Sequence, residues 1–335
     1  MDPVLLTRQL VDIESTTGNE SAAVEFLTAY LAKAGLTVER MPVERNRFNL
    51  FAYWPEGPVP AVVFSTHTDC VPPFIPSSED DSRIFGRGSC DAKGIIASQV
   101  AAALRLHEED ICVGLLFVVG EERDSLGAKA ANQNPRGSRF LVNGEPTGNC
   151  IALAAKGALR VEVIASGKMA HSAYPELGES AIEKLLDSLQ PLRSMALPSN
   201  PENPEVGSTT MNIGIIEGGR ATNVVPDFAK AQLLYRLVTS SEPLRQQIVD
   251  AVGNRARVDF VLDIAYMRFR TVPGIPTMTA SFTTDIPWLL NWGEPVLLGP
   301  GSILVAHTDG EYVEKRELRE AVDLYALIAR ELLRG

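Results

Sequence analysis

The chain has 335 residues, of which 45% are hydrophobic and 22% are charged, and its formal net charge is −11. This length favours two domains, and the ordinary balance of apolar and charged residues excludes a largely disordered chain. The negative charge disfavours nucleic acid as a partner, because the phosphates of nucleic acid would be repelled.

Helices and strands alternate in the first part of the chain. Asp2 and Pro3 predict the beginning of a helix that runs to about Glu14, and Gly35 ends a second helix. A third helix is predicted over 94–109. Apolar stretches predict strands at 36–41, 48–54, 61–66, 112–119 and 139–143. This alternation predicts an α/β fold, in which a mixed, partly parallel sheet has helices on both faces.

The pattern changes near Lys156. The elements expected beyond it are 158–166, 178–193, 209–217, 228–238, 243–253 and 257–265, in the order β-α-β-β-α-β. Because such a unit is a self-contained two-layer structure, we expect it to be an inserted domain. We assign residues 1–156 and 271–335 to the first domain and 157–270 to the insertion. One apolar stripe predicts a last amphipathic helix through Leu318, Ala321, Val322, Tyr325, Ile328 and Leu332.

Neither a membrane span nor a secretory leader is expected. The longest apolar run, Cys112 to Gly120, is far shorter than the roughly 20 residues that cross a bilayer. The first residues are acidic where a signal peptide is basic. The four cysteines include no Cys-x-x-Cys pair, which disfavours disulfides and a cysteine-zinc site. We therefore expect a cytoplasmic protein.

Metal-ligating side chains follow several of the apolar strands. His67 and His307 each end an apolar run, in AVVFSTHTD and SILVAHTD. Acidic residues that follow strands or turns are Asp91, Glu121, Glu122 and Glu145. Because α/β sheets place functional groups at strand ends, these residues indicate one site at one edge of the sheet.

This residue set suits two divalent metal ions. Zinc accepts imidazole nitrogen and carboxylate oxygen, and a zinc pair polarises a carbonyl and lowers the pKa of water to about 7. Glu121 and Glu122 can divide metal binding and proton transfer, because adjacent side chains point apart on an extended backbone. Asp69, two residues after His67, can accept the second ring N–H of that histidine.

Simpler interpretations stand beside several of these. Asp91 could cap the helix that begins near Gly94. Arg236 could equally be an exposed strand residue paired with an acid. Cys90 is expected to be a packing residue, and His107 matches no motif and is expected to be exposed.

Five runs of sequence resemble one known family. They are STHTDCVP (65–72), GRGSCDAKG (86–94), GEE (120–122), GEPT (144–147) and AHTDGEYV (306–313). In this order and spacing they are similar to the dinuclear-zinc aminoacylases, acetylornithine deacetylases, succinyl-diaminopimelate desuccinylases and glutamate carboxypeptidases. The resemblance extends over nearly the whole chain, and it implies a zinc-peptidase-like catalytic domain with an inserted lid or dimerisation domain.

The resemblance also implies the metal ligands. His67 and Glu145 would bind one ion, and His307 and Glu122 would bind the other. Asp91 would bridge both ions, and the peptide bond after it would be cis. Zinc is the expected metal, although cobalt or manganese would fit the same ligands.

Three residues gain catalytic roles from the resemblance. Glu121 would be the general base that later protonates the leaving amine, and Asp69 would orient His67. His171, in the run GKMAHSAYP, would stabilise the oxyanion, often from the partner subunit in this family.

Three further residues would bind substrate. Asn223, in EGGRATNVVP, would contact it. Arg236 would bind its α-carboxylate, for which a planar guanidinium is suited. Gly301, in the turn before His307, would line the pocket by close backbone approach.

The function implied is metal-dependent hydrolysis of the amide bond of an N-acyl amino acid, most simply N-acetylornithine or a similar N-acetyl amino acid. A desuccinylase, dipeptidase or carboxypeptidase would use the same metal core. An alternative of a different class is a metal-free protein that binds acyl amino acids without cleaving them. A dinucleotide-dependent oxidoreductase is disfavoured, because no Gly-x-Gly-x-x-Gly turn is present. A homodimer through the insertion is expected.

Overall fold

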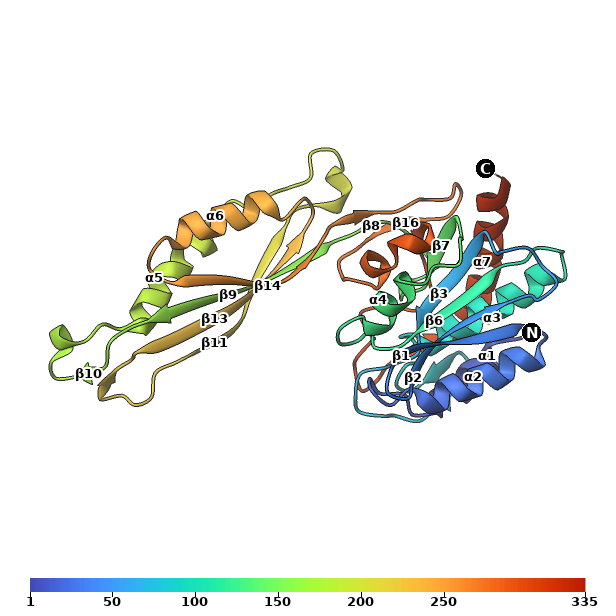
Figure 1. Cartoon of the computed structure of the whole chain (residues 1–335), viewed down its shortest axis with the longest axis horizontal. Coiled ribbons are helices and arrows are strands. Elements are labelled where there is room, and N and C mark those ends of the chain that lie inside the picture. Colours follow the sequence, from blue (N-terminus) through green and yellow to red (C-terminus); the bar gives the residue numbers. More distant parts are fainter. Residues whose placement is uncertain (335) are drawn as a thin grey trace. The chain divides into compact units, whose positions relative to one another are not determined.

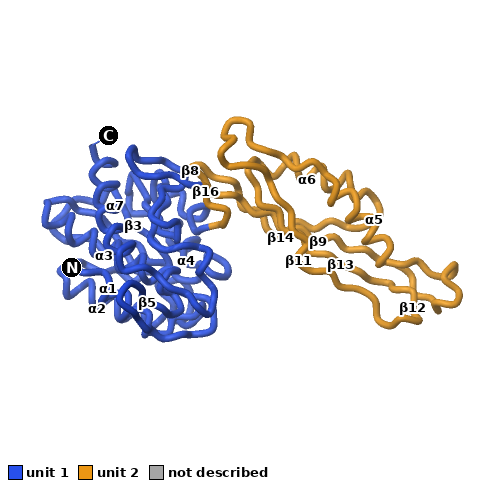
Figure 2. The backbone as a smooth tube through the Cα atoms, turned by 180° about the vertical axis from the view of Figure 1, so that it is seen from behind, with its two compact units in different colours: residues 1–153, 269–278, 284–335 blue, residues 154–268, 279–283 orange. Residues whose placement is uncertain are grey.

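The computed structural model describes residues 1–334, which form two compact units (Figure 2). Unit 1 comprises Met1–Leu153, Phe269–Met278 and the chain from Thr284 onward. Unit 2 comprises Ala154–Arg268 and Thr279–Thr283. Unit 2 is therefore an insertion in the sequence of unit 1.

The main sheet of unit 1 is mixed, as expected from the sequence. Its strand order is β1 (Thr37–Glu44), β2 (Arg47–Tyr53), β6 (Gly114–Val118), β3 (Val62–His67), β7 (Phe140–Asn143) and β17 (Glu294–Leu297). The pairs β3–β6, β3–β7 and β7–β17 are parallel, whereas β1–β2 and β2–β6 are antiparallel. The carboxyl ends of the parallel strands therefore share one edge of the sheet.

Helices cover both faces of this sheet. One face packs against α1 (Pro3–Val11), α2 (Ser21–Lys33), α3 (Lys93–His107) and α7 (Lys315–Arg334). The other face packs against α4 (Leu126–Asn132) and the short 3-10 helices at Ile286–Trp288 and Leu290–Trp292 (Figure 1). Because both faces are covered, β3 and β6 are buried along their whole length. The stripe predicted on the last helix is buried at every position.

Helix α1 begins as predicted and ends earlier. The Asp2 carboxylate accepts the Val4 N–H at 3.1 Å and so caps the first turn. The helix ends at Val11 rather than near Glu14, because the next residues pair with the segment after β3. The Ser15 hydroxyl donates to the Thr68 carbonyl at 2.8 Å, and the Cys70 N–H donates to the Ser15 carbonyl at 3.0 Å. Tertiary hydrogen bonds thus override the helical pattern here.

Two three-stranded sheets are also present. One has the order β18 (Tyr312–Glu314), β5 (Arg83–Phe85) and β4 (Ser78–Glu79). The other has the order β15 (Met267–Arg268), β8 (Ile151–Ala155) and β16 (Thr277–Ala280), at the residues where the chain leaves and re-enters unit 1. No helix within residues 1–334 combines the length and apolarity that crossing a bilayer requires.

Unit 2 has the predicted β-α-β-β-α-β order. Its antiparallel sheet runs β11 (Thr210–Gly218), β13 (Phe228–Leu237), β9 (Gly157–Ser166) and β14 (Arg257–Ile264). Helices α5 (Ala181–Ser194) and α6 (Glu242–Val252) pack on one face and bury alternate strand residues (Figure 1). The opposite face carries the other half of each alternation, which is more exposed. A side ribbon pairs β10 (Ala170–His171) with β12 (Val224–Val225), and 3-10 turns span Pro175–Leu177 and Pro204–Val206.

Candidate metal centre and active site

The parallel strands of unit 1 carry the predicted ligands to one edge. His67 is the last residue of β3, Glu122 comes after β6, and Glu145 comes after β7. Backbone hydrogen bonds continue the pairing past the strand ends, since the Thr68 N–H donates to the Val118 carbonyl at 2.8 Å. Parallel pairing therefore brings these segments of distant sequence together.

Asp91 lies between the two predicted ligand histidines. Its Oδ1 is 2.9 Å from His67 Nε2, and its Oδ2 is 3.4 Å from His307 Nε2. A second carboxylate near His307 is that of Glu122, whose Oε1 is 3.0 Å from the same Nε2. Ligand atoms of His67, Asp91 and Glu122 all lie within 4.8 Å of one another. The peptide bond from Asp91 to Ala92 is cis, as the resemblance implied.

The carboxylates and imidazoles of this cluster shift one another's pKa values. The Asp91 and Glu122 carboxylates, which accept hydrogen bonds from the protonated ring, raise the pKa of His307 to about 10. Burial opposes ionisation of Asp91, yet the two histidines hold its pKa below the usual value. Burial would lower the pKa of His67, but the Asp69 and Asp91 carboxylates raise it well above the usual value. The metal-free cluster therefore holds protons at the positions that cations would occupy.

Glu145 is a buried acid of the predicted ligand set that lacks a hydrogen-bond partner on one oxygen. Its side chain is 4% exposed, and its Oε1 has no hydrogen-bond partner within the described chain. Burial raises the pKa of Glu145 well above the usual value. A buried acceptor without a partner is costly, so its presence suits an oxygen ligand for a cation.

Glu121 and Glu122 diverge as the sequence suggested. The Glu122 carboxylate contacts His307, whereas Glu121 makes no contact with either ligand histidine among the hydrogen bonds of residues 1–334. Burial, and after it the charge of Glu145, raises the pKa of Glu121 well above the usual value. A carboxyl group that holds a proton easily is suited to general acid–base chemistry.

Asp69 contacts His67 in a way the sequence did not show. The ring Nδ1 is 3.0 Å from the backbone carbonyl of Asp69 and 3.7 Å from its carboxylate. The carboxylate instead accepts the N–H groups of Gly120, Glu121 and Glu122 at 2.9, 3.1 and 3.2 Å. It also accepts the Thr17 hydroxyl at 2.8 Å. Asp69 therefore fixes the backbone that carries both glutamates.

Glu311 anchors the candidate site, and sequence reasoning did not single it out. Its Oε1 accepts the N–H groups of Gly88, Cys90 and Asp91 at 3.0, 3.1 and 3.1 Å. Its Oε2 accepts Arg87 at 2.7 Å, and the same Arg87 nitrogen donates to the Thr308 carbonyl at 3.0 Å. The network therefore joins the segment of Asp91 to the residue after His307. The signal was present, since Glu311 lies in the AHTDGEYV run.

Asp285 was missed as well. It is 1% exposed, and neither carboxylate oxygen has a hydrogen-bond partner within residues 1–334. Burial raises its pKa to about 7, although the nearby Ser125 hydroxyl lowers it. Its charge contributes to the raised pKa values of Glu121 and Glu145. The loop before Asp285 carries no strand signal, so no sequence pattern singles this residue out.

Gly301 packs against the metal-ligand segment. It is buried at φ +82°, and a Cβ there would lie 2.5 Å from the sulfur of Cys90. A side chain would therefore press on the residue before Asp91. Cys90 is buried, in agreement with the packing role expected for it.

His171 and Asn223 lie together in unit 2. His171 pairs with Val224 across the β10–β12 ribbon, and the Ser172 N–H donates to the Asn223 carbonyl at 3.0 Å. The His171 ring accepts the Ala173 N–H on Nδ1 at 3.1 Å, so the neutral ring carries its proton on Nε2. The side chain is exposed, which leaves Nε2–H free to donate. Arg236 lies elsewhere in unit 2, at the end of β13.

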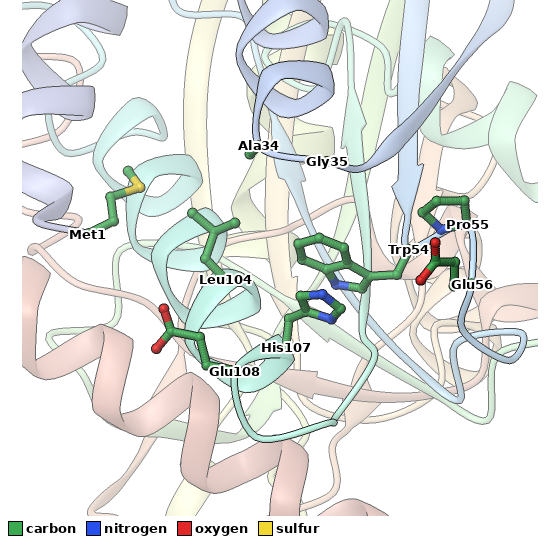
Figure 3. Close-up of a pocket in the computed structure, with 9 residues that line it drawn as sticks. All are labelled: Met1, Ala34, Gly35, Trp54, Pro55, Glu56, Leu104, His107 and Glu108. Carbon is green, nitrogen blue, oxygen red and sulfur yellow. The ribbon is translucent and has the colours of Figure 1, made fainter.

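His107 has a structural explanation. It is exposed, as expected, and its ring stacks on Trp54 with centroids 3.5 Å apart and planes 7° apart (Figure 3). The pair borders a surface depression of unit 1 that also includes Leu104 and Glu108. None of the predicted ligands lines this depression.

Comparison with known sequences decides the family. A peptidase M20 domain-containing protein of Schizosaccharomyces pombe is 38% identical over 334 residues, covering 96% of this chain and 82% of that protein. The chain belongs to the M20 peptidase family. The family resemblance predicted from the motifs is thereby confirmed.

Other comparisons agree with this M20 assignment. A probable carboxypeptidase of Aspergillus clavatus is 34% identical over 97% of this chain and 88% of its own length. The family model for a peptidase dimerisation domain matches residues 153–259 of this M20 peptidase.

Solved structures share the M20 fold. The aminopeptidase PepT of Bacillus cereus matches with a TM-score of 0.82 at 23% identity, covering 99% of this chain and 98% of that one. A dinuclear metal-binding M20 peptidase of Bacillus subtilis matches with a TM-score of 0.74 at 14% identity, covering 99% and 98%. The predicted α/β fold with an inserted domain is confirmed.

Proposed function

We propose that this M20 peptidase is a metal-dependent hydrolase that cuts the amide bond of an N-acylated amino acid or short peptide with a free α-carboxylate. The observation that carries the proposal is the Asp91 carboxylate, whose two oxygens face His67 and His307, with Glu122 against the second histidine. This is the arrangement expected of a carboxylate that bridges two cations.

The residues fit two divalent metal ions. His67 and Glu145 would hold one ion, His307 and Glu122 the other, and Asp91 both. The unpartnered Oε1 of Glu145 supports this assignment, since it is buried and lacks a donor. When bound, the metal pair would polarise the substrate carbonyl and lower the pKa of water. We propose zinc, because imidazole and carboxylate are its usual ligands; cobalt or manganese would bind the same set.

The chain's own groups would move the proton and place the substrate. Glu121 would take the proton of the attacking water and return it to the leaving amine. Asp69 would hold Glu121 in place through its hydrogen bonds to the Gly120–Glu122 backbone. His171 would donate from Nε2 to the developing oxyanion, with Asn223 beside it. Arg236 would bind the free carboxylate of the substrate.

The test is hydrolysis of a panel of N-acyl amino acids and dipeptides by the purified chain, with zinc or cobalt and with chelator. The panel includes N-acetylornithine, which the sequence favours, and C-terminal peptide substrates, which the carboxypeptidase relatives favour. Cleavage that chelator abolishes and metal restores is expected. Bound metal without cleavage of any member would reject this substrate class.

A metal-free binding protein is the second candidate. It would require no general base, yet Glu121 and the whole predicted ligand set are present. Metal analysis of the purified chain separates the two functions. Two ions per chain are expected of the hydrolase, and none would favour the binding protein.

We further propose that the chain forms a homodimer through unit 2. The match to a peptidase dimerisation domain supports this. Strand β11 is an edge of the unit 2 sheet, and its Ile215 and Ile216 are 51% and 58% exposed. An exposed apolar edge strand is suited to pairing with a second copy. Light scattering should give a molecular mass twice that of one chain, and the Ile216→Lys variant should give a lower mass.

A further inference from the structure

The open face of the unit 2 sheet contains a pocket that holds two arginines. The pocket has a volume of about 340 Å³ and lies wholly within unit 2. Its polar lining residues include Arg160, Arg236, Asn212 and Gln232. The resemblance to the family gave a role to Arg236 and none to Arg160.

Strand register places the two arginines on adjacent strands of the same face. Arg236 of β13 pairs with Ala158 of β9, and Leu234 pairs with Arg160. Arg160 and Arg236 are therefore diagonal neighbours, at the separation of about 7–8 Å that such positions have in antiparallel sheets. The row through Arg160 continues to Asn212 on one side through Leu234, and to Leu262 on the other.

Neither arginine has an internal counterion. Among residues 1–334, no carboxylate forms an ion pair with Arg160 or Arg236, and the second is half-buried. The acids of the same face are already paired. Glu162 lies 3.4 Å from Lys230, and Asp259 lies 2.9 Å from Arg257. The pocket therefore carries two positive charges, one exposed and one half-buried, that no carboxylate of the described residues balances.

The lining matches a compact ligand with two anionic groups. A guanidinium group binds a carboxylate through paired hydrogen bonds. Because the pocket has two guanidinium groups at separate positions, it could bind two carboxylates at once. Leu234 and Leu262 supply apolar surface for the short carbon chain between the groups, and Asn212 and Gln232 supply amide donors. A cationic side chain, such as that of ornithine, would meet two like charges instead.

We propose that this pocket selects substrates that release an acidic amino acid, with Arg236 binding the α-carboxylate and Arg160 the side-chain carboxylate. The proposal rests on the proposed hydrolase function and names its substrate class. Arg160 is then the residue that distinguishes glutamate or aspartate from neutral and basic residues.

The experiment compares N-acetylglutamate, N-acetylglutamine and N-acetylornithine as substrates of the zinc-loaded chain. The first two have side chains of the same length and shape, which end in a carboxylate and in a neutral amide. The wild type should favour N-acetylglutamate by roughly 10–100-fold in kcat/KM, the range expected for a hydrogen bond between charged groups. Arg160→Gln should remove most of that preference, chiefly by lowering kcat/KM for N-acetylglutamate.

Arg257→Gln is the matched control, because Arg257 lies on the same sheet face and is paired with Asp259. It should leave the preference intact. A wild type that favours N-acetylglutamine or N-acetylornithine would overturn the proposal. So would an Arg160→Gln variant that keeps the preference or slows all three substrates equally.

Calorimetric binding of glutarate and butyrate tests the pocket without any hydrolysis. Glutarate, with two carboxylates, should bind the wild type more tightly than butyrate by at least about tenfold, and Arg160→Gln should remove the difference. If no substrate is cleaved but glutarate binds in this way, the proposed hydrolase function is wrong and the two-anion pocket is supported. Equal binding of both acids overturns the two-anion pocket whatever the enzyme assay shows.

Discussion

The two units carry uncompensated charge of opposite sign. In unit 1, buried carboxylates gather around two histidines and leave the Glu145 Oε1 without a donor. In unit 2, Arg160 and Arg236 line one pocket without an acid. We propose that the first arrangement binds cations and the second binds anions. Burial makes the unpaired Glu145 oxygen costly in the unliganded protein, whereas Arg160 is exposed and Arg236 half-buried, so in unit 2 it is the lack of an acidic partner that indicates the ligand.

The units also differ in how they hold their charges. In unit 1 most of the predicted ligands lie on loops, and the Asp69 and Glu311 carboxylates fix two of these loops by accepting their backbone N–H groups. In unit 2 the arginines project from paired strands, where the sheet register alone sets their spacing. Removing one anchor should therefore disturb many atoms in unit 1 and few in unit 2.

The largest expected effect is on turnover, from Glu121→Gln. The variant keeps the shape of the side chain and loses its capacity to carry a proton, so kcat should fall by roughly 10²–10⁴-fold. Metal content, measured by mass spectrometry of the metals, should remain that of the wild type. Loss of metal in this variant would show that Glu121 is a metal ligand rather than a general base.

Glu311→Ala tests the anchoring of unit 1. The change leaves Arg87, which is 2% exposed, without its buried partner, and frees the N–H groups of the Asp91 segment. The free energy of unfolding should fall by about 3–5 kcal/mol in a denaturant titration, with loss of bound metal. The control is Glu79→Ala, since Glu79 pairs with Arg8 at the surface and should contribute below about 1 kcal/mol. Equal losses in the two variants would refute the anchoring role.

His171→Ala tests whether unit 2 takes part in the reaction. Loss of an oxyanion donor should lower kcat by roughly 10²–10³-fold with little change in KM. His107→Ala is the matched control, because that histidine only stacks on Trp54. An unchanged kcat for His171→Ala would leave Arg236 and the pocket as the contribution of unit 2.

The last prediction distinguishes the cation site of unit 1 from the anion pocket of unit 2 by the pH dependence of ligand affinity. The raised pKa of His307, about 10, means that its ring holds a proton at neutral pH in the metal-free chain. Metal binds the unprotonated ring, so zinc affinity should rise with pH below this pKa, by about tenfold per pH unit for each proton displaced. Competition with a zinc-binding dye at about pH 6, 7 and 8 measures this affinity. Glutarate affinity should stay flat over the same range, because arginine does not titrate there.

The fold and the metal-site segments could be predicted because their signals are local. Apolar strands that end in His67 or Glu121–Glu122 reveal both the strand and the ligands at its end, and the parallel topology brings those ends together. The roles assigned to these residues remain predictions until the variants are measured. The alternation of β13 likewise placed Arg236 on a strand.

The contacts that complete each site could not be predicted, because they depend on tertiary pairing. Asp285 lies in an irregular loop, and its proximity to the other acids is visible only in three dimensions. Glu311 shows its role only through hydrogen bonds to residues more than two hundred positions earlier. Arg160 lacks an acidic partner although Glu162 lies on the same face, because Glu162 pairs with Lys230. That pairing depends on strand register and cannot be seen in the sequence.

The order of the ligands along the chain has a consequence for biosynthesis. His67, Asp91, Glu122 and Glu145 precede the inserted unit 2, whereas His307 and Glu311 come after it. During translation the four early residues and all of unit 2 are synthesised before His307 and Glu311. If these residues bind metal as proposed, the nascent chain cannot complete the second cation site until the whole of unit 2 has been synthesised, and metal loading of that site follows the synthesis of unit 2.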